Sequence, residues 1–223
     1  QGNRSLLLAF FLLSQEEEAY IKEHFRIKVC HMQSPEMRLN INRKNESSVY
    51  EAVCYLAQLG HKRIGGIFCI DEIDDSFLMA RKRGFLKAIS QINLDQDESL
   101  IGQLHGECEK DSVISVIEKI FVPQKPPTAL FCYSDEVAIE VMSWIMKQGY
   151  RIPEDISVLS FDGIPFAGRV TPSLSTISQP VEYQAKCIIN GMLYLQDGIE
   201  RPCDEKGNEY LLQIRDSVGF PSH

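Results

Sequence analysis

The clearest hydrophobic pattern of the chain lies between residues 126 and 180. Residues 128–133 form a short apolar run of strand length, and apolar side chains then recur at helical spacing over residues 136–147. Gly149 follows as a stop signal, and residues 156–161 form a second buried-strand run. The pattern predicts a strand, a helix and a second, parallel strand, joined as a right-handed βαβ unit.

Polar residues follow directly after both predicted strands. Ser134 and Asp135 come after the first, and Asp162 comes after the second. Ligands of open parallel sheets bind outside the carboxyl ends of the strands. We therefore expect a ligand site here. Ser134 and Asp135 form a good helix N-cap pair, and Asp135 is expected to be a cap rather than a ligand group.

The remaining sequence shows the same alternation, apart from a stretch before Asn45 that has no clear periodicity. It favours an α/β fold with mainly parallel sheets flanked by helices. The pattern predicts strands at 6–13, 27–31, 64–70, near 104 and near 210–215, and helices after 14 and at 47–59, 77–89, 113–121 and 182–195.

Composition narrows the classes of function. The formal net charge of the 223 residues is −8, which argues against duplex DNA binding by this segment, because that needs clustered Lys and Arg. The chain has no G-x-S-x-G elbow and no phosphate-binding G-x-x-x-x-G-K-[ST] loop, and its five histidines form no cluster. We expect no enzyme activity, no metal and no cofactor.

The seven cysteines are odd in number and show no C-x-x-C spacing. This pattern is typical of reduced thiols and predicts a cytoplasmic protein. The apolar run at 6–13 is too short to span a bilayer and lacks the features of a signal peptide.

Five blocks resemble one known family, in the family's order. They read EAVCYLAQLGHKRIGGIF (51–68), R-x-x-G-F (81–85), PTALFCYSDEVAIEVM (127–142), GYRIPEDISVLSFDGIPFA (149–167) and TPSLSTISQPVEYQAKCIINGML (171–193). Together they are similar to the sugar-sensing half of the lactose-repressor/galactose-repressor family of bacterial transcription regulators. The phrases LFCYSDE and GIF after GHKR are closer to the arabinose-repressor branch.

The resemblance implies a two-lobed, type I periplasmic-binding-protein-like fold. Residues 1–61 and 178–200 would form the N-lobe, and residues 62–177 and 201–223 the C-lobe. The family's sensor begins with a strand, a helix and a strand that have no counterpart before Gln1, so the N-lobe is expected to be incomplete.

The resemblance also implies a sugar site. Arg81 matches the arginine that grips a pair of sugar hydroxyls, which its planar fork suits. Asp162 matches the aspartate that accepts hydroxyl protons, and Phe161 beside it would offer either a stacking face or a core side chain. Without the resemblance, Arg81 reads as a surface arginine and Asp162 as a turn residue.

Two further candidate ligand residues depart from the family's pattern. Ser134 stands where the family commonly has asparagine, and a hydroxyl cannot make a two-pronged amide contact. Gln33 stands where aspartate or asparagine is frequent. Both departures put the usual sugar specificity in doubt.

The expected function is therefore effector binding and dimerisation in a bacterial transcription regulator. A small sugar, with arabinose favoured by the two short phrases, would bind in the cleft between the lobes of a homodimer. DNA would be bound by a module outside this chain, and no membrane is involved. The alternative is a solute-binding protein that delivers a sugar to a transporter.

Overall fold

A computed structural model provides the structure of the chain. It describes residues 7–10, 15–24, 28–31, 35–70, 77–105, 110–121, 125–199, 201 and 206–222. The chain divides into two compact units, and each is described by itself. The smaller unit comprises Gln1–Leu39 and Pro180–Glu209, and the larger comprises Asn40–Gln179 and Tyr210–His223.

The boundary near residue 40 differs from the one predicted near residue 61. Helix α2 runs over Pro35–Gln58, and the part from Asn40 onward belongs to the larger unit. There Val49, Val53 and Leu56 are fully buried in its core. The helix begins at Pro35, so the prediction of a start at about residue 47 was wrong. Proline at its first position fits a helix start, because that residue needs no N–H partner.

The smaller unit contains two parallel strands, β1 (Leu7–Phe10) and β2 (Lys28–His31), in which Leu7 pairs with Lys28. It also contains helices α1 (Gln15–His24) and α6 (Val181–Asp197), the latter ending at Gly198 in the left-handed conformation. Cys187 on α6 is disulfide-bonded, which departs from the reduced thiols that the cysteine pattern favours.

The larger unit is built on a six-stranded sheet of order β4-β3-β5-β6-β7-β8, parallel except for β8. The predicted α/β class with a mainly parallel sheet is confirmed. Its strands are β3 (Ile64–Ile70), β4 (Ile101–His105), β5 (Ala129–Cys132), β6 (Ser157–Asp162), β7 (Ser175–Ser178) and β8 (Leu211–Gln213). Its other elements are α3 (Phe77–Gln91), the short 3-10 helix η1 (Glu98–Leu100), α4 (Lys110–Phe121) and α5 (Asp135–Lys147).

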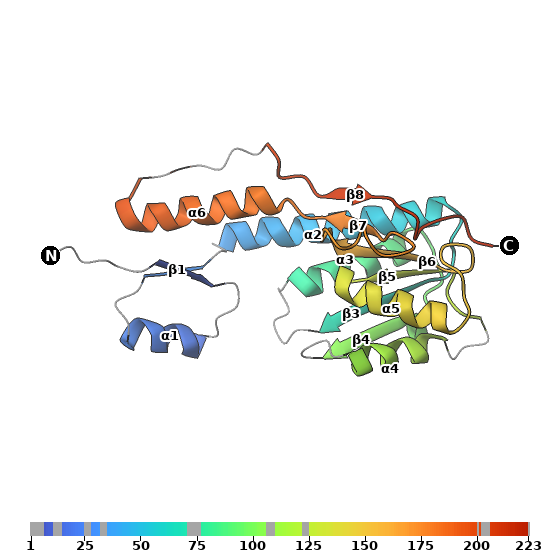
Figure 1. Ribbon diagram of the computed structural model, residues 1–223. Helices are drawn as coiled ribbons and strands as arrows, with labels where there is room; N and C mark the ends of the chain where they lie inside the picture. Colours follow the sequence, from blue (N-terminus) through green and yellow to red (C-terminus); the bar gives the residue numbers. More distant parts are fainter. Residues whose placement is uncertain are drawn as a thin grey trace. The chain divides into compact units, whose positions relative to one another are not determined.

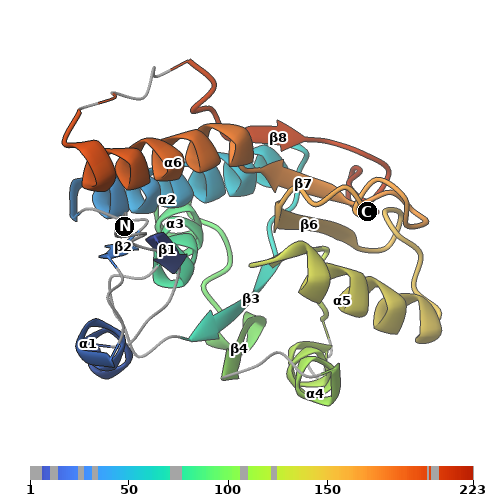
Figure 2. The same ribbon diagram turned by 60° about the vertical axis from the view of Figure 1, so that its left-hand side comes forward.

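Helices cover both faces of this sheet (Figures 1 and 2). Alternate strand residues point to opposite faces. Leu130 of β5 therefore packs in the cluster made with α4 and α5, whereas Phe131 packs in the cluster made with α2 and α3. With both faces covered, the central strands β3, β5 and β6 are buried, and their ends are the places where they can present side chains to a ligand.

Strand β7 was missed by sequence analysis. Its residues Ser175-Thr176-Ile177-Ser178 contain one apolar side chain, so they lack the signal of a buried strand. Ser175 and Thr176 are nevertheless fully buried. Their hydroxyls are satisfied by hydrogen bonds, Ser175 with Arg215 and Thr176 with Asp135.

Within the described part of the chain, no helix combines the length and the apolar character that crossing a membrane requires.

Candidate functional site

Arg81 joins three elements at the carboxyl edge of the sheet. It lies in α3, is 3% exposed, and donates from Nε to the side-chain oxygen of Asn45 at 3.0 Å. Nη1 donates to the carbonyl oxygen of Tyr133, after β5, at 2.6 Å, and Nη2 lies 3.1 Å from Oδ1 of Asp162, at the end of β6. A guanidinium has more N–H donors than these contacts use, so Arg81 can still donate to a ligand.

The aromatic ring of Phe161 lies against this guanidinium. The distance from Cζ of Arg81 to the ring centre is 3.8 Å, which is a cation–π arrangement. On the same ring packs Tyr210, whose ring centre is 5.9 Å away. Because Phe161 is 0% exposed, its ring supports Arg81 in this structure.

Among the described residues, the side-chain contacts of Asp162 fall on one of its two carboxylate oxygens. Its Oδ1 receives the Arg81 contact and a 2.8 Å hydrogen bond from Nε2 of Gln179, while among the described residues no group donates to Oδ2. The side chain is 27% exposed. A charged oxygen with solvent access is a strong acceptor for a hydroxyl proton.

Burial controls the electrostatics of the pair. It lowers the pKa of Arg81, and the negative charge of Asp162 opposes that shift. It raises the pKa of Asp162; the nearby cation of Arg81 opposes this, and the carboxylate of Asp135 adds to it. The two charges thus compensate each other at a place where burial limits the hydration of Arg81 most strongly. Within the described residues, no group of three or more His, Cys, Asp or Glu side chains could hold a metal ion.

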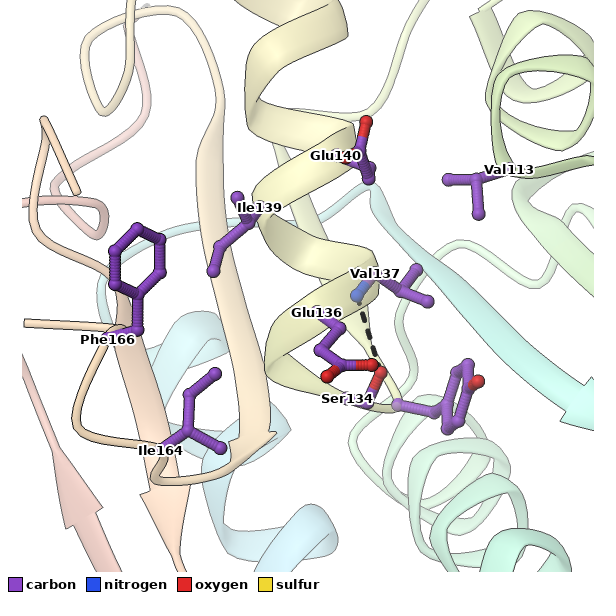
Figure 3. Close-up of a pocket in the computed structure, with 9 residues that line it drawn as sticks. Val113, Ser134, Glu136, Val137, Ile139, Glu140, Ile164 and Phe166 are labelled. Atoms are coloured by element: carbon purple, nitrogen blue, oxygen red, sulfur yellow. Dashed lines mark hydrogen bonds between the residues drawn. The ribbon is translucent and has the colours of Figure 1, made fainter. Parts of the chain in front are cut away.

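Ser134 lies at the same edge of the sheet, but it lines a separate hollow. It is the N-cap of α5, and its hydroxyl accepts a 3.4 Å hydrogen bond from the backbone N–H of Val137. It also lines a hollow of about 520 Å³, in which α5 faces Ile164 and Phe166 of the segment after β6 (Figure 3). We call this feature the α5 hollow. Ser134 is linked to Arg81 through the preceding carbonyl group, that of Tyr133.

The expected capping role of Asp135 was wrong. The hydroxyl that caps α5 belongs to Ser134, and Asp135 is the first helical residue and is 0% exposed. Its carboxylate accepts hydrogen bonds from Ser160, Thr176 and the backbone of Ile164. It therefore belongs to the core beneath the strand ends.

Sequence analysis missed two residues of the Arg81 cluster, by which we mean Arg81, Asn45, Phe161, Asp162 and Gln179. Asn45 stands at the end of a stretch without periodicity, and Gln179 precedes a proline. Neither position has a local signal, because the contacts bridge 36 residues for Asn45 and 17 for Gln179. Gln33, the remaining predicted site residue, lies outside the described residues.

Comparison with known proteins identifies the family of the chain. The model of the periplasmic binding protein-like domain matches residues 53–218. The probable HTH-type transcriptional repressor ExuR of Bacillus subtilis is 36% identical over 183 residues, which cover 80% of this chain and 53% of that protein. The HTH-type transcriptional repressor PurR of Vibrio atlanticus is 34% identical over 137 residues, 61% of this chain and 40% of that protein. The chain thus spans about half the length of the curated relatives it matches or less.

Solved structures show the same fold. A sugar-binding LacI-family regulator of Escherichia coli, complexed with phosphate, has a TM-score of 0.75 at 23% identity and covers 96% of this chain and 77% of its own. A LacI-family regulator of Lactobacillus casei with bound sucrose has a TM-score of 0.67 at 22% identity, covering 78% and 64%.

The family match extends over most of the larger unit, including every residue of the Arg81 cluster except Asn45. The chain therefore belongs to the periplasmic binding protein-like domain family, and its resemblance to the lactose-repressor/galactose-repressor regulators is confirmed.

Proposed function

We propose that this chain is the effector-binding part of a bacterial transcriptional repressor and that its effector is a small sugar or sugar-like molecule. The observation that carries the proposal is the Arg81 cluster. It places a buried cation with spare donors beside a carboxylate whose Oδ2 is free among the described residues. Such a pair can donate to one hydroxyl oxygen and accept the proton of the next.

DNA binding is assigned to a module outside this chain. The relatives are named as HTH-type repressors, and this chain spans about half of their length or less. The net charge of −8 is unsuited to holding phosphates. A cytoplasmic location and the absence of enzyme activity follow from this assignment. The relatives favour it over a solute-binding protein for a transporter, since each of them is named as a repressor.

The identity of the sugar is a separate part of the proposal. Arabinose is the first candidate, on the likeness of two short phrases to the arabinose-repressor branch. Sucrose and inorganic phosphate are further test ligands, because related structures hold them. Ser134, whose hydroxyl caps α5, supports a specificity that differs from that of relatives with asparagine at this position.

Thermal unfolding of the intact protein tests the proposal. A ligand at about one hundred times its dissociation constant adds about 2.7 kcal/mol to the stability of the native state, which raises the melting temperature by several degrees. We expect this rise with one member of a panel of pentoses, hexoses, sucrose, sugar phosphates and inorganic phosphate, and we expect the Arg81→Ala and Asp162→Ala variants to lose it. A folded protein that responds to none of them contradicts the proposal.

We also propose that the intact protein is a homodimer and that the α5 hollow contributes to the contact. Phe166 at its rim is 56% exposed, and Ile139 and Ile164 line the hollow beside it (Figure 3). An exposed aromatic side chain beside partly buried apolar ones is typical of an interaction site. Light scattering should show a dimer that Phe166→Ser weakens. The control Phe220→Ser, at a site 76% exposed and outside the hollow, should leave the dimer intact. A monomeric wild-type protein contradicts this proposal.

A further inference from the structure

A fully buried carboxylate lies beneath the Arg81 cluster. Asp135 is 0% exposed and accepts three hydrogen bonds: from the hydroxyl of Ser160 at 2.5 Å, from the hydroxyl of Thr176 at 2.5 Å and from the backbone N–H of Ile164 at 2.7 Å. A buried carboxylate is costly unless its oxygens are satisfied, and here they are. The position at the start of α5 favours the negative charge further.

These hydrogen bonds hold the turn that follows β6. The backbone N–H of Ile164 binds Asp135 directly, and that of Gly163 donates at 3.2 Å to the same Thr176 hydroxyl that binds Asp135. Two consecutive amides of the turn are thus fixed by one carboxylate and its hydroxyl partner.

The turn needs this support because its backbone is unusual. Asp162 has φ = +120°, a conformation that residues other than glycine rarely adopt. At Gly163, φ is +74°, and a Cβ there would lie 2.5 Å from Cα of Ser178. Strained conformations of this kind persist only where the surroundings over-determine them.

We propose that Asp135 is the positioning residue of the effector site, since its hydrogen bonds to Ile164 and Thr176 hold the turn that directs the Asp162 carboxylate toward Arg81 and the ligand. The ligand in this proposal rests on the proposed function, whereas the geometry of the turn does not depend on it. Asp135 touches no ligand and acts through Asp162. By the same hydrogen bond it places Ile164, which lines the α5 hollow (Figure 3).

Substitutions at Thr176 test the proposal most cleanly. Thr176→Val keeps the shape of the side chain but removes the hydroxyl that serves both Gly163 and Asp135, whereas Thr176→Ser keeps the hydroxyl. Asp135→Asn is a second variant, in which one acceptor becomes a donor. Ile117→Val, in the core of α4 on the same unit, controls for a general loss of stability.

Two readouts are needed. The first is the affinity of the intact protein for the sugar found in the thermal screen. We expect Thr176→Val and Asp135→Asn to weaken it about tenfold, the equivalent of one hydrogen bond, while Thr176→Ser and Ile117→Val stay close to wild type. Equal affinities in Thr176→Val and Ile117→Val would mean a purely structural role and would overturn the proposal.

The second readout needs no ligand. The titration of the Asp162 carboxyl group, followed by NMR in the intact protein, reports its contact with Arg81. We expect the titration to shift in Thr176→Val and to remain at the wild-type position in Thr176→Ser and Ile117→Val. An unchanged titration in Thr176→Val overturns the positioning role whether or not any sugar binds. A shifted titration in a protein that binds no sugar supports the positioning role and contradicts the proposed function alone.

Discussion

Gly84 of α3 faces the main-chain carbonyl of Glu46 of α2 with no room for a side chain. A Cβ on Gly84 would lie 3.0 Å from the carbonyl carbon of Glu46 and closer still to its oxygen. This close approach brings Arg81, one turn earlier on α3, within hydrogen-bonding distance of Asn45 on α2. The glycine of the R-x-x-G-F motif therefore helps to position the arginine.

Substitution of this glycine should damage the packing of α2 against α3. We expect Gly84→Ala to lower the free energy of unfolding by about 1 to 3 kcal/mol, because the helix backbones must move apart. Urea denaturation measures this difference. Ser90→Ala, at an exposed position of the same helix, is the control and should change stability little. If Gly84→Ala is as stable as the control, α2 and α3 do not approach each other in this way.

The Arg81–Asp162 pair should show a measurable coupling energy. A double-mutant cycle of Arg81→Met and Asp162→Asn, followed by urea unfolding, should give about 0.5 to 3 kcal/mol, the range found for residues in one network. Arg81 is 4% exposed in its side chain, so water cannot replace its partner.

The Arg151–Asp155 pair provides the control cycle. Its charged atoms are closer, with 2.7 Å between Nη2 of Arg151 and Oδ1 of Asp155 against 3.1 Å for Arg81–Asp162, but the Arg151 side chain is 68% exposed. Hydration and salt screen such a pair, so its coupling should be smaller than that of Arg81–Asp162. Equal coupling in the two cycles would show that burial adds nothing to the Arg81 cluster.

His61 should make the stability of the larger unit depend on pH. Burial lowers the pKa of His61 from its ordinary value of 6.5, although the hydrogen bond to the carbonyl of Gly219, 3.0 Å long, opposes the shift. The folded state thus favours the neutral ring. The stability that the neutral His61 ring contributes is fully present above pH 6.5, and it is lost as the pH falls from 6.5 through the pKa of His61 in the folded state.

Urea unfolding between pH 8 and about pH 5 checks this dependence by comparing wild type with His61→Gln. The free-energy difference between the two proteins should shrink as the pH falls, because only wild type must protonate a buried ring. A difference that stays constant over the range would mean that His61 is not held neutral.

The main features of the fold could be predicted where hydrophobic periodicity is strong. β5, α5 and β6 were identified from apolar runs and helical spacing, and the parallel arrangement followed from the βαβ rule. β7 could not be predicted, because Ser175 and Thr176 are buried through hydrogen bonds to residues 40 and 41 positions away. Only the folded chain brings those partners together.

The candidate site could be predicted in part. Arg81, Phe161 and Asp162 were named from their motifs, and the structure brings these three together. Their roles in ligand binding remain predictions. The role of Asp135 was misjudged, since a helix-start aspartate normally caps the helix. Nothing in the local sequence shows that a hydroxyl from β7 reaches its carboxylate.

The most direct test of the account is calorimetric titration of the panel sugar that stabilises the intact protein, with arabinose taken first. Asp162→Asn should weaken binding about 10- to 100-fold, since a hydrogen bond to a charged group contributes about 1.5 to 3 kcal/mol. Asp155→Asn, which removes a carboxylate elsewhere on the same unit, should bind as wild type does. Wild-type affinity in Asp162→Asn would contradict the assignment of the effector site to the Arg81 cluster.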